Sequence, residues 1–185
     1  MPPIEPFSQG DLDGLCSIYA LINAVRVLFP KLEPAAAHDL FRHLVRCLED
    51  RPLPLGTVCD GLGERELQQL ARECRDYVAD EFGCVFHTGH LPIERRISVQ
   101  SIWTGLQREL DGSSAAIIGL AGREQHWTVG YAATGRTVRL VDSSDMSLLV
   151  RARCTVNTTI GRYQLDPAAI IVLRRGKRPR RKAAW

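Results

Sequence analysis

A polar loop that runs directly into an apolar helix, over residues 9–27, constrains the fold of this chain more than any other stretch. The loop is rich in glycine and aspartate, and Cys16 stands at its junction with the helix. From Cys16 to Val27 most positions are apolar, and they cover nearly the whole helix circumference. A helix that is apolar nearly all round is a buried one. The chain is therefore expected to fold around this helix, with Cys16 at its edge.

Cys16 has two interpretations at this stage. In the first turn of a helix, a thiol lies among unpaired backbone N–H groups and at the positive end of the helix dipole. Both features favour the thiolate, which is the form that attacks electrophiles. A free cysteine is also among the residues most often buried for packing alone. A histidine base and a group that orients it would favour the nucleophile.

A predicted hairpin supplies both groups. Residues 126–132 alternate as a strand, a turn follows at 134–136, and residues 137–141 form a second strand. In an antiparallel hairpin the start of one strand lies beside the end of the other. His126 opens the first strand and Asp142 follows the second, so the sequence predicts that they meet.

The predicted catalytic set is therefore Cys16, His126 and Asp142, with Asp145 as a second candidate for the carboxylate, past the strand end. These residues resemble the catalytic segments of the papain-like superfamily of cysteine peptidases, especially its compact bacterial members. The order Gln9, Cys16, His126, Asp142 matches that superfamily, as does the gap of sixteen residues from His126 to Asp142. The resemblance covers about residues 9–28 and 114–173.

The resemblance implies roles for residues around Cys16. Gln9, seven residues before Cys16 where many papain-like enzymes have six, would donate its side-chain amide to the oxyanion hole. Asp13 and Gly14 are expected at the substrate cleft. From its place next to His126, Trp127 would shield the bond between His126 and Asp142 or form the floor of the cleft, and a core role is the alternative. The run from Asp13 to Cys16 is also similar to the cysteine motif of ovarian-tumour-type deubiquitinases, in which the histidine usually lies near the end of the domain.

The same triad supports several reactions on a protein or peptide substrate. Hydrolysis of a peptide or isopeptide bond through an acyl-enzyme is the first expectation, because water is the default acceptor in an open cleft. Glutamine deamidation, transglutaminase-like chemistry and other acyl transfer are alternatives. A further alternative is a binding module that kept the fold and lost the activity.

The order of predicted elements indicates an α+β fold, with a helical N-terminal half whose cysteine-bearing helix packs on a C-terminal antiparallel sheet. Residues 1–173 are expected to form this papain-like domain, and residues 174–185 a basic tail. Helices are predicted over about 16–28, 34–48, 64–82 and 99–110, and strands over 84–86, 115–120, 126–132, 137–141, 147–156 and 168–173.

The net charge of +3 comes from the tail, which holds seven Lys or Arg and no acidic residue. The remainder, with 17 basic and 21 acidic residues, carries about −4 and has no sign of nucleic-acid binding. Such a tail can contact an acidic partner, nucleic acid or an anionic membrane. A disordered, solubilising tail is the alternative.

Cysteine and hydropathy patterns indicate the compartment. The six cysteines include no Cys-x-x-Cys pair, and His87 and His90, three apart in a predicted loop, lack a third ligand nearby. A reduced protein without metal or cofactor is therefore expected. No apolar stretch approaches the ~20 residues that span a bilayer, and the N-terminal residues lack a signal-peptide pattern. A cytoplasmic location is predicted; the sequence does not indicate an oligomeric state.

Overall fold

The computed structural model of the chain describes residues 5–9, 14–49, 61–93, 96–122, 125–157 and 162–177. Within these ranges the fold is mixed α+β, with four α-helices and one sheet. The helices are α1 (Cys16–Leu28), α2 (Pro34–Glu49), α4 (Glu64–Phe82) and α5 (Val99–Glu109). The strands are β1 (Phe86–His90), β2 (Ser114–Gly122), β3 (His126–Ala133), β4 (Thr137–Val141), β5 (Leu148–Val150), β6 (Cys154–Thr155) and β7 (Tyr163–Arg175), with a short 3₁₀ helix at Arg151–Arg153.

The sheet has the strand order β1-β7-β2-β3-β4-β5, and all of these neighbours pair antiparallel. Only the two-residue β6 pairs parallel, with β7. The predicted α+β class with an antiparallel sheet is confirmed, as are the four predicted helices and the hairpin of β3 and β4.

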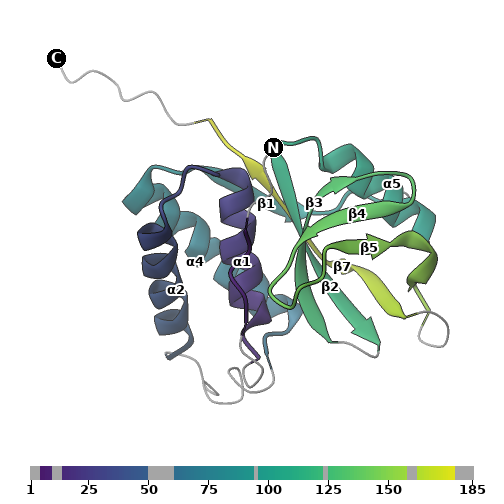
Figure 1. Ribbon diagram of the computed structural model, residues 1–185, viewed down its shortest axis with the longest axis horizontal. Coiled ribbons are helices and arrows are strands. Elements are labelled where there is room, and N and C mark those ends of the chain that lie inside the picture. Colours follow the sequence, from purple (N-terminus) through teal and green to yellow (C-terminus); the bar gives the residue numbers. More distant parts are fainter. Residues whose placement is uncertain are drawn as a thin grey trace.

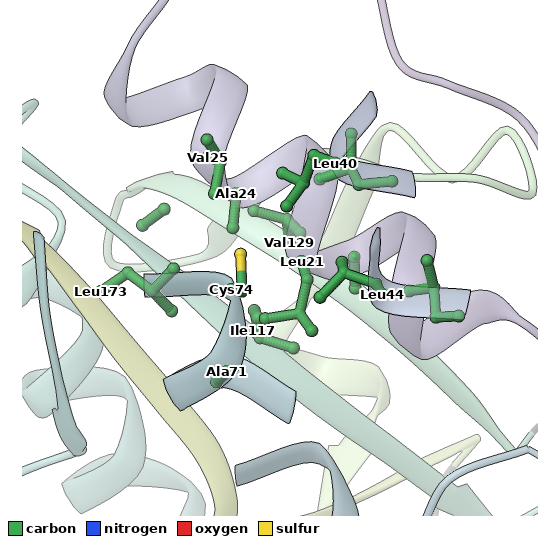
Figure 2. Close-up of a cluster of buried hydrophobic side chains, with 14 of the residues drawn as sticks. Leu21, Ala24, Val25, Leu40, Leu44, Ala71, Cys74, Ile117, Val129 and Leu173 are labelled. Atoms are coloured by element: carbon green, nitrogen blue, oxygen red, sulfur yellow. The ribbon is translucent and has the colours of Figure 1, made fainter. Parts of the chain in front are cut away.

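Helices α1, α2 and α4 lie on one face of the sheet, where α1 packs on β2, β3 and β7, α4 packs on β1 and β7, and α2 packs on the other two helices (Figure 1). Figure 2 shows side chains from all three helices meeting those of β2, β3 and β7 around the buried Cys74. Leu21 of α1, Leu40 of α2 and Ile117 of β2 are fully buried there. This packing fixes the position of α1, and with it the position of Cys16.

The opposite face of the sheet is also covered. Successive residues of a strand point to opposite faces, and Ile117 of β2 belongs to the core under α1 while Ile118 belongs to a second core under α5. Trp103 of α5 is fully buried in this second core, and its indole N–H donates to the Thr134 carbonyl at 2.7 Å. The sheet is thus sandwiched between helices, where the sequence predicted only the layer that carries Cys16.

Strand β4 has the predicted bounds, β2 and β3 extend one or two residues beyond theirs, and the other three predicted strands differ more. β1 covers 86–90 rather than 84–86, so His87 and His90 lie in a strand and not in a loop. The predicted strand 147–156 is divided into β5, the 3₁₀ helix and β6. β7 starts at Tyr163, well before residue 168, and includes Pro167.

Pro167 is accommodated at an irregularity of the sheet. The register between β2 and β7 shifts between the pairs Ile118↔Ile170 and Leu120↔Leu165. Proline has no N–H to donate, so it occurs in sheets at edges and bulges. The shift explains why the apolar pattern alone predicted only the second half of this strand.

The first two residues of the predicted basic tail, Arg174 and Arg175, are part of β7. Arg174 bonds Glu109 through its Nε at 2.7 Å, and the guanidinium of Arg175 lies 5.3 Å from the centre of the Phe29 ring. The predicted boundary at 173 therefore falls inside the strand, while residues 178–185 lie outside the described ranges. Among the helices of the described ranges, none is long and apolar enough to cross a membrane.

Candidate active site

Cys16 is the first residue of α1, as the sequence predicted. Its N-cap residue is Leu15, whose side chain makes no capping hydrogen bond to the N–H groups of the first turn. Those groups and the helix dipole favour negative charge at this position. The residue is only 8% exposed, and its Sγ lies 3.9 Å from the carbonyl oxygen of the predicted cleft residue Gly14.

His126 and Asp142 meet as the hairpin geometry predicted. Val129 of β3 pairs with Val141 of β4, which brings the start of β3 near the end of β4. The Nε2 atom of His126 lies 2.7 Å from Oδ2 of Asp142. The side chain of Asp142 is 0% exposed and that of His126 is 11% exposed, so this pair is shielded from water.

The turn after β4 fixes the carboxylate of Asp142. Its Oδ1 accepts the backbone N–H of Ser144 at 2.8 Å and that of Met146 at 3.2 Å. Oδ2 thereby remains directed at His126. Asp145 is exposed in the same turn, with a φ of 62°, so Asp142 and not Asp145 is the partner of His126.

The environment favours an imidazolium at His126. Burial by itself lowers the pKa of His126, but hydrogen bonds to Asp142 and Cys16, together with their negative charges, raise the pKa to about 9. Burial also acts on Asp142 and raises its pKa, while the hydrogen bond and charge of His126 outweigh that effect and lower it. Both shifts stabilise the charged pair.

Gln9 lies beside the turn that holds Asp142. Its backbone N–H donates to the Ser143 carbonyl at 2.9 Å, and the Ser143 hydroxyl is 3.5 Å from its Oε1. The buried Asn23 of α1 anchors the same segment, since its side chain bonds both the N–H and the carbonyl of Phe7. The structure therefore ties residues 5–9 to both α1 and the Asp142 turn. Asp13, the other predicted residue of this loop, lies outside the described ranges.

A cleft of about 220 Å³ opens beside Cys16 and His126. Trp127 lines it, as predicted, and the indole N–H of Trp127 donates to the Leu62 carbonyl at 2.9 Å. Further lining residues are Gly61, Leu62, Glu64, Gly119, Leu120, Ala121, Gln125, Asp166 and Ala169. We call this the Cys16 cleft.

The sequence did not single out Glu64, Gln125 or Asp166 as site residues. Glu64 begins α4 and Asp166 lies where the register of β7 shifts against β2. Bulges often occur next to active sites, where they redirect a side chain. Pro167 was the one signal for such an irregularity, and it did not indicate which neighbour would enter the cleft.

The wall of the Cys16 cleft leaves no room for a side chain at position 119, which is a glycine. A Cβ atom at this position would lie 2.9 Å from Cζ3 of Trp127 and 2.9 Å from Cβ of Ala169. Both distances are shorter than packed carbon atoms allow. A side chain here would therefore displace Trp127 from its place beside His126.

The two histidines that the sequence placed three apart do not form a metal site. His87 and His90 are an odd number of residues apart in β1, so they point to opposite faces of the strand. In the part of the chain that the structure describes, no three His, Cys, Asp or Glu residues are grouped as metal ligands. The five cysteines of that part all have free thiols.

No protein-family model, curated protein or solved structure matches this chain. The site must be interpreted from its chemistry. It combines a thiol at a helix N-terminus, a histidine of raised pKa and a buried carboxylate that orients the histidine. Such a combination is suited to nucleophilic attack on an acyl carbon.

Proposed function

We propose that the protein is a papain-like cysteine peptidase or isopeptidase in which Cys16 is the nucleophile, His126 the acid and base, and Asp142 the orienting residue. The observation that carries the proposal is that His126, which lines the same cleft as Cys16, lies 2.7 Å from the fully buried carboxylate of Asp142 behind it. A helix that begins with the cysteine and packs on an antiparallel sheet, with the histidine at a strand start, agrees with it.

The two ring nitrogens of His126 have different roles in this mechanism. Nε2 is engaged by Asp142, which leaves Nδ1 for the proton of Cys16. The Cys16 thiolate attacks the carbonyl carbon, and the Cys16 N–H and the Gln9 side-chain amide stabilise the oxyanion. Nδ1 then gives its proton to the leaving amine as the C–N bond breaks. Water, deprotonated by His126, hydrolyses the thioester and restores the free thiol.

A mass-spectrometric assay tests this function. The protein and its Cys16→Ala variant are incubated with a peptide library that includes branches linked through lysine side chains. We expect new chain ends, or release of the branch, only with the parent protein. Products heavier by about one dalton with intact chains would indicate deamidation instead. The absence of any Cys16-dependent product would contradict the proposal.

A further inference from the structure

Two carboxylates share the Cys16 cleft with the candidate nucleophile. Glu64, at the start of α4, and Asp166, at the register shift of β7, both line it. Among the described residues that line this cleft there is no lysine or arginine. The cleft therefore presents negative charge on two elements that are far apart in the sequence.

Local contacts hold both carboxylates in place. Oε1 of Glu64 accepts the side-chain amide of Gln68 at 2.9 Å, and Oδ1 of Asp166 accepts the backbone N–H of Ala168 at 2.9 Å. Each of these contacts uses one carboxylate oxygen. A carboxylate can accept several hydrogen bonds, so each side chain can also bind a cationic group in the cleft.

The rest of the lining suits the stem of a long basic side chain. Leu62, Leu120 and Ala169 give apolar surface, and Trp127 adds an aromatic ring. Lysine and arginine bury their methylene groups on such surface while the charged head reaches a polar partner. A cation is also attracted to the face of an indole ring.

We propose that the Cys16 cleft selects substrates that carry a lysine or arginine side chain next to the scissile bond, with Glu64 and Asp166 as the specificity-determining residues. The inference rests on the proposed function, because it concerns the same cleft. A thiolate and an imidazolium together carry no net charge, and the carboxylate of Asp142 is buried behind His126 and outside the cleft lining, so Glu64 and Asp166 are the acidic groups that a substrate side chain meets in the cleft. An acidic substrate side chain at this position is disfavoured by the same charges.

Three electrophilic probes test the preference. They are acetyl-capped acyloxymethyl ketones of lysine, norleucine and glutamate, which differ in the charge of one side chain. The second-order rate constant for alkylation of Cys16 by each probe is measured by mass spectrometry. At low ionic strength we expect the lysine probe to react about tenfold faster than the norleucine probe and the glutamate probe to react more slowly than both. Added salt should reduce these ratios.

Variants that remove one negative charge each test whether Glu64 and Asp166 cause the preference for the lysine probe. We expect Glu64→Gln and Asp166→Asn each to lower the ratio of lysine to norleucine rates, and the double variant to bring it close to one. The matched control is Glu66→Gln, which removes a charge from the same first turn of α4 at an exposed residue outside the cleft lining. It should keep the parent ratio.

The outcomes separate the two proposals. Equal alkylation of Cys16 by the lysine and norleucine probes, or a ratio that the double variant does not change, would overturn the charge preference and leave the proposed function standing. Failure of the norleucine probe and of iodoacetamide to alkylate Cys16 in the parent protein would overturn the proposed function, and the charge preference with it.

Discussion

Two regions of the molecule bring a cysteine and a histidine together, and only one of them has the further features of a catalytic site. In the Cys16 cleft, Cys16 of α1 meets His126 of β3. On α2, Cys47 Sγ lies 3.6 Å from Nε2 of His43, one helical turn earlier. The residue types are the same, so the difference between the regions lies in their surroundings.

The surroundings differ in helix polarity and in the partner of the histidine. Cys16 begins its helix, while Cys47 lies in the last turn of α2, where unpaired carbonyl groups oppose negative charge. His126 is held by a buried carboxylate, while the His43 ring, besides its contact with Cys47, stacks on Tyr77 at 4.0 Å between centroids. A cysteine and a histidine in contact are therefore not enough to indicate a catalytic site, and the proposed chemistry depends on the helix start and the carboxylate.

Removal of each thiol should separate the two regions most clearly. We expect Cys16→Ala to lower kcat/KM by at least about 10³-fold, because the acyl-enzyme cannot form. Cys47→Ala, which removes the thiol beside His43, should leave kcat/KM within about twofold of the parent value. Hydrolysis rates measured on a substrate from the peptide library would check both. Equal losses in the two variants would contradict the distinction.

Asp142→Asn tests the carboxylate itself. Oδ1 already accepts two backbone N–H groups, so an amide NH₂ at that position meets two donors, and at the Oδ2 position it favours the tautomer of His126 whose Nε2 carries no proton. We expect kcat/KM to fall by about 10²- to 10⁴-fold. Loss of the negative charge removes the part of the rise in the pKa of His126 that is due to Asp142, and leaves burial, which lowers the pKa, opposed by Cys16 alone.

The pH profile distinguishes this account from simple misfolding. In the parent protein, activity should decline as the pH rises through about 9, because the imidazolium of His126 loses its proton. In Asp142→Asn, the residual activity should decline at a lower pH. A variant whose activity is reduced equally at every pH would show that Asp142 does not control the protonation of His126.

Stability should depend on pH in the same direction. A raised pKa of His126 means that its contribution to stability is present below the ordinary value of 6.5 and is lost as pH rises through about 9. We expect Tm to fall between pH 7 and pH 10 by on the order of 5 °C more in the parent than in His126→Ala. His43→Ala serves as the control and should keep the parent dependence. Identical curves for His126→Ala and the parent would contradict the shift.

Gly119→Ala should have the smallest effect on activity, through the geometry of the Cys16 cleft. The added Cβ collides with Trp127 and Ala169 and should cost about 1–3 kcal/mol of unfolding free energy. A moderate loss of kcat/KM is expected because Trp127 follows His126 directly. Denaturant unfolding and the hydrolysis assay measure the two effects. Gly135→Ala is a suitable control, since its added Cβ has no heavy atom within 4 Å.

Much of the scaffold could be predicted because local patterns determine it. Helix α4 has its stripe of Leu67, Leu70 and Cys74 and ends where Gly83 adopts a φ of 62°, and the structure gives it the predicted bounds. The hairpin brought His126 to Asp142 for a similarly local reason, since a tight turn fixes which strand ends adjoin. The catalytic roles of these residues and of Gln9 stay predictions.

What the sequence did not reveal depends on pairing between distant segments. The His-Thr-Gly-His of β1 has no apolar alternation, and it forms a strand because residues 86–90 pair with residues 171–175 of β7. Asp166 enters the Cys16 cleft through the shift of β7 against β2, which no single segment encodes. Glu64 and Asp166 are more than a hundred residues apart in the sequence, so no local pattern could indicate that they line the same cleft.

Alkylation by iodoacetamide at mildly acidic pH, followed by peptide mapping, tests the central claim most directly. The account predicts selective labelling of Cys16 over the other five cysteines, lost in His126→Ala and retained in His43→Ala. Such a result would mean that a thiolate and imidazolium exist before any substrate binds. Uniform labelling, or labelling of Cys16 that His126→Ala leaves unchanged, would contradict the claim that His126 activates Cys16.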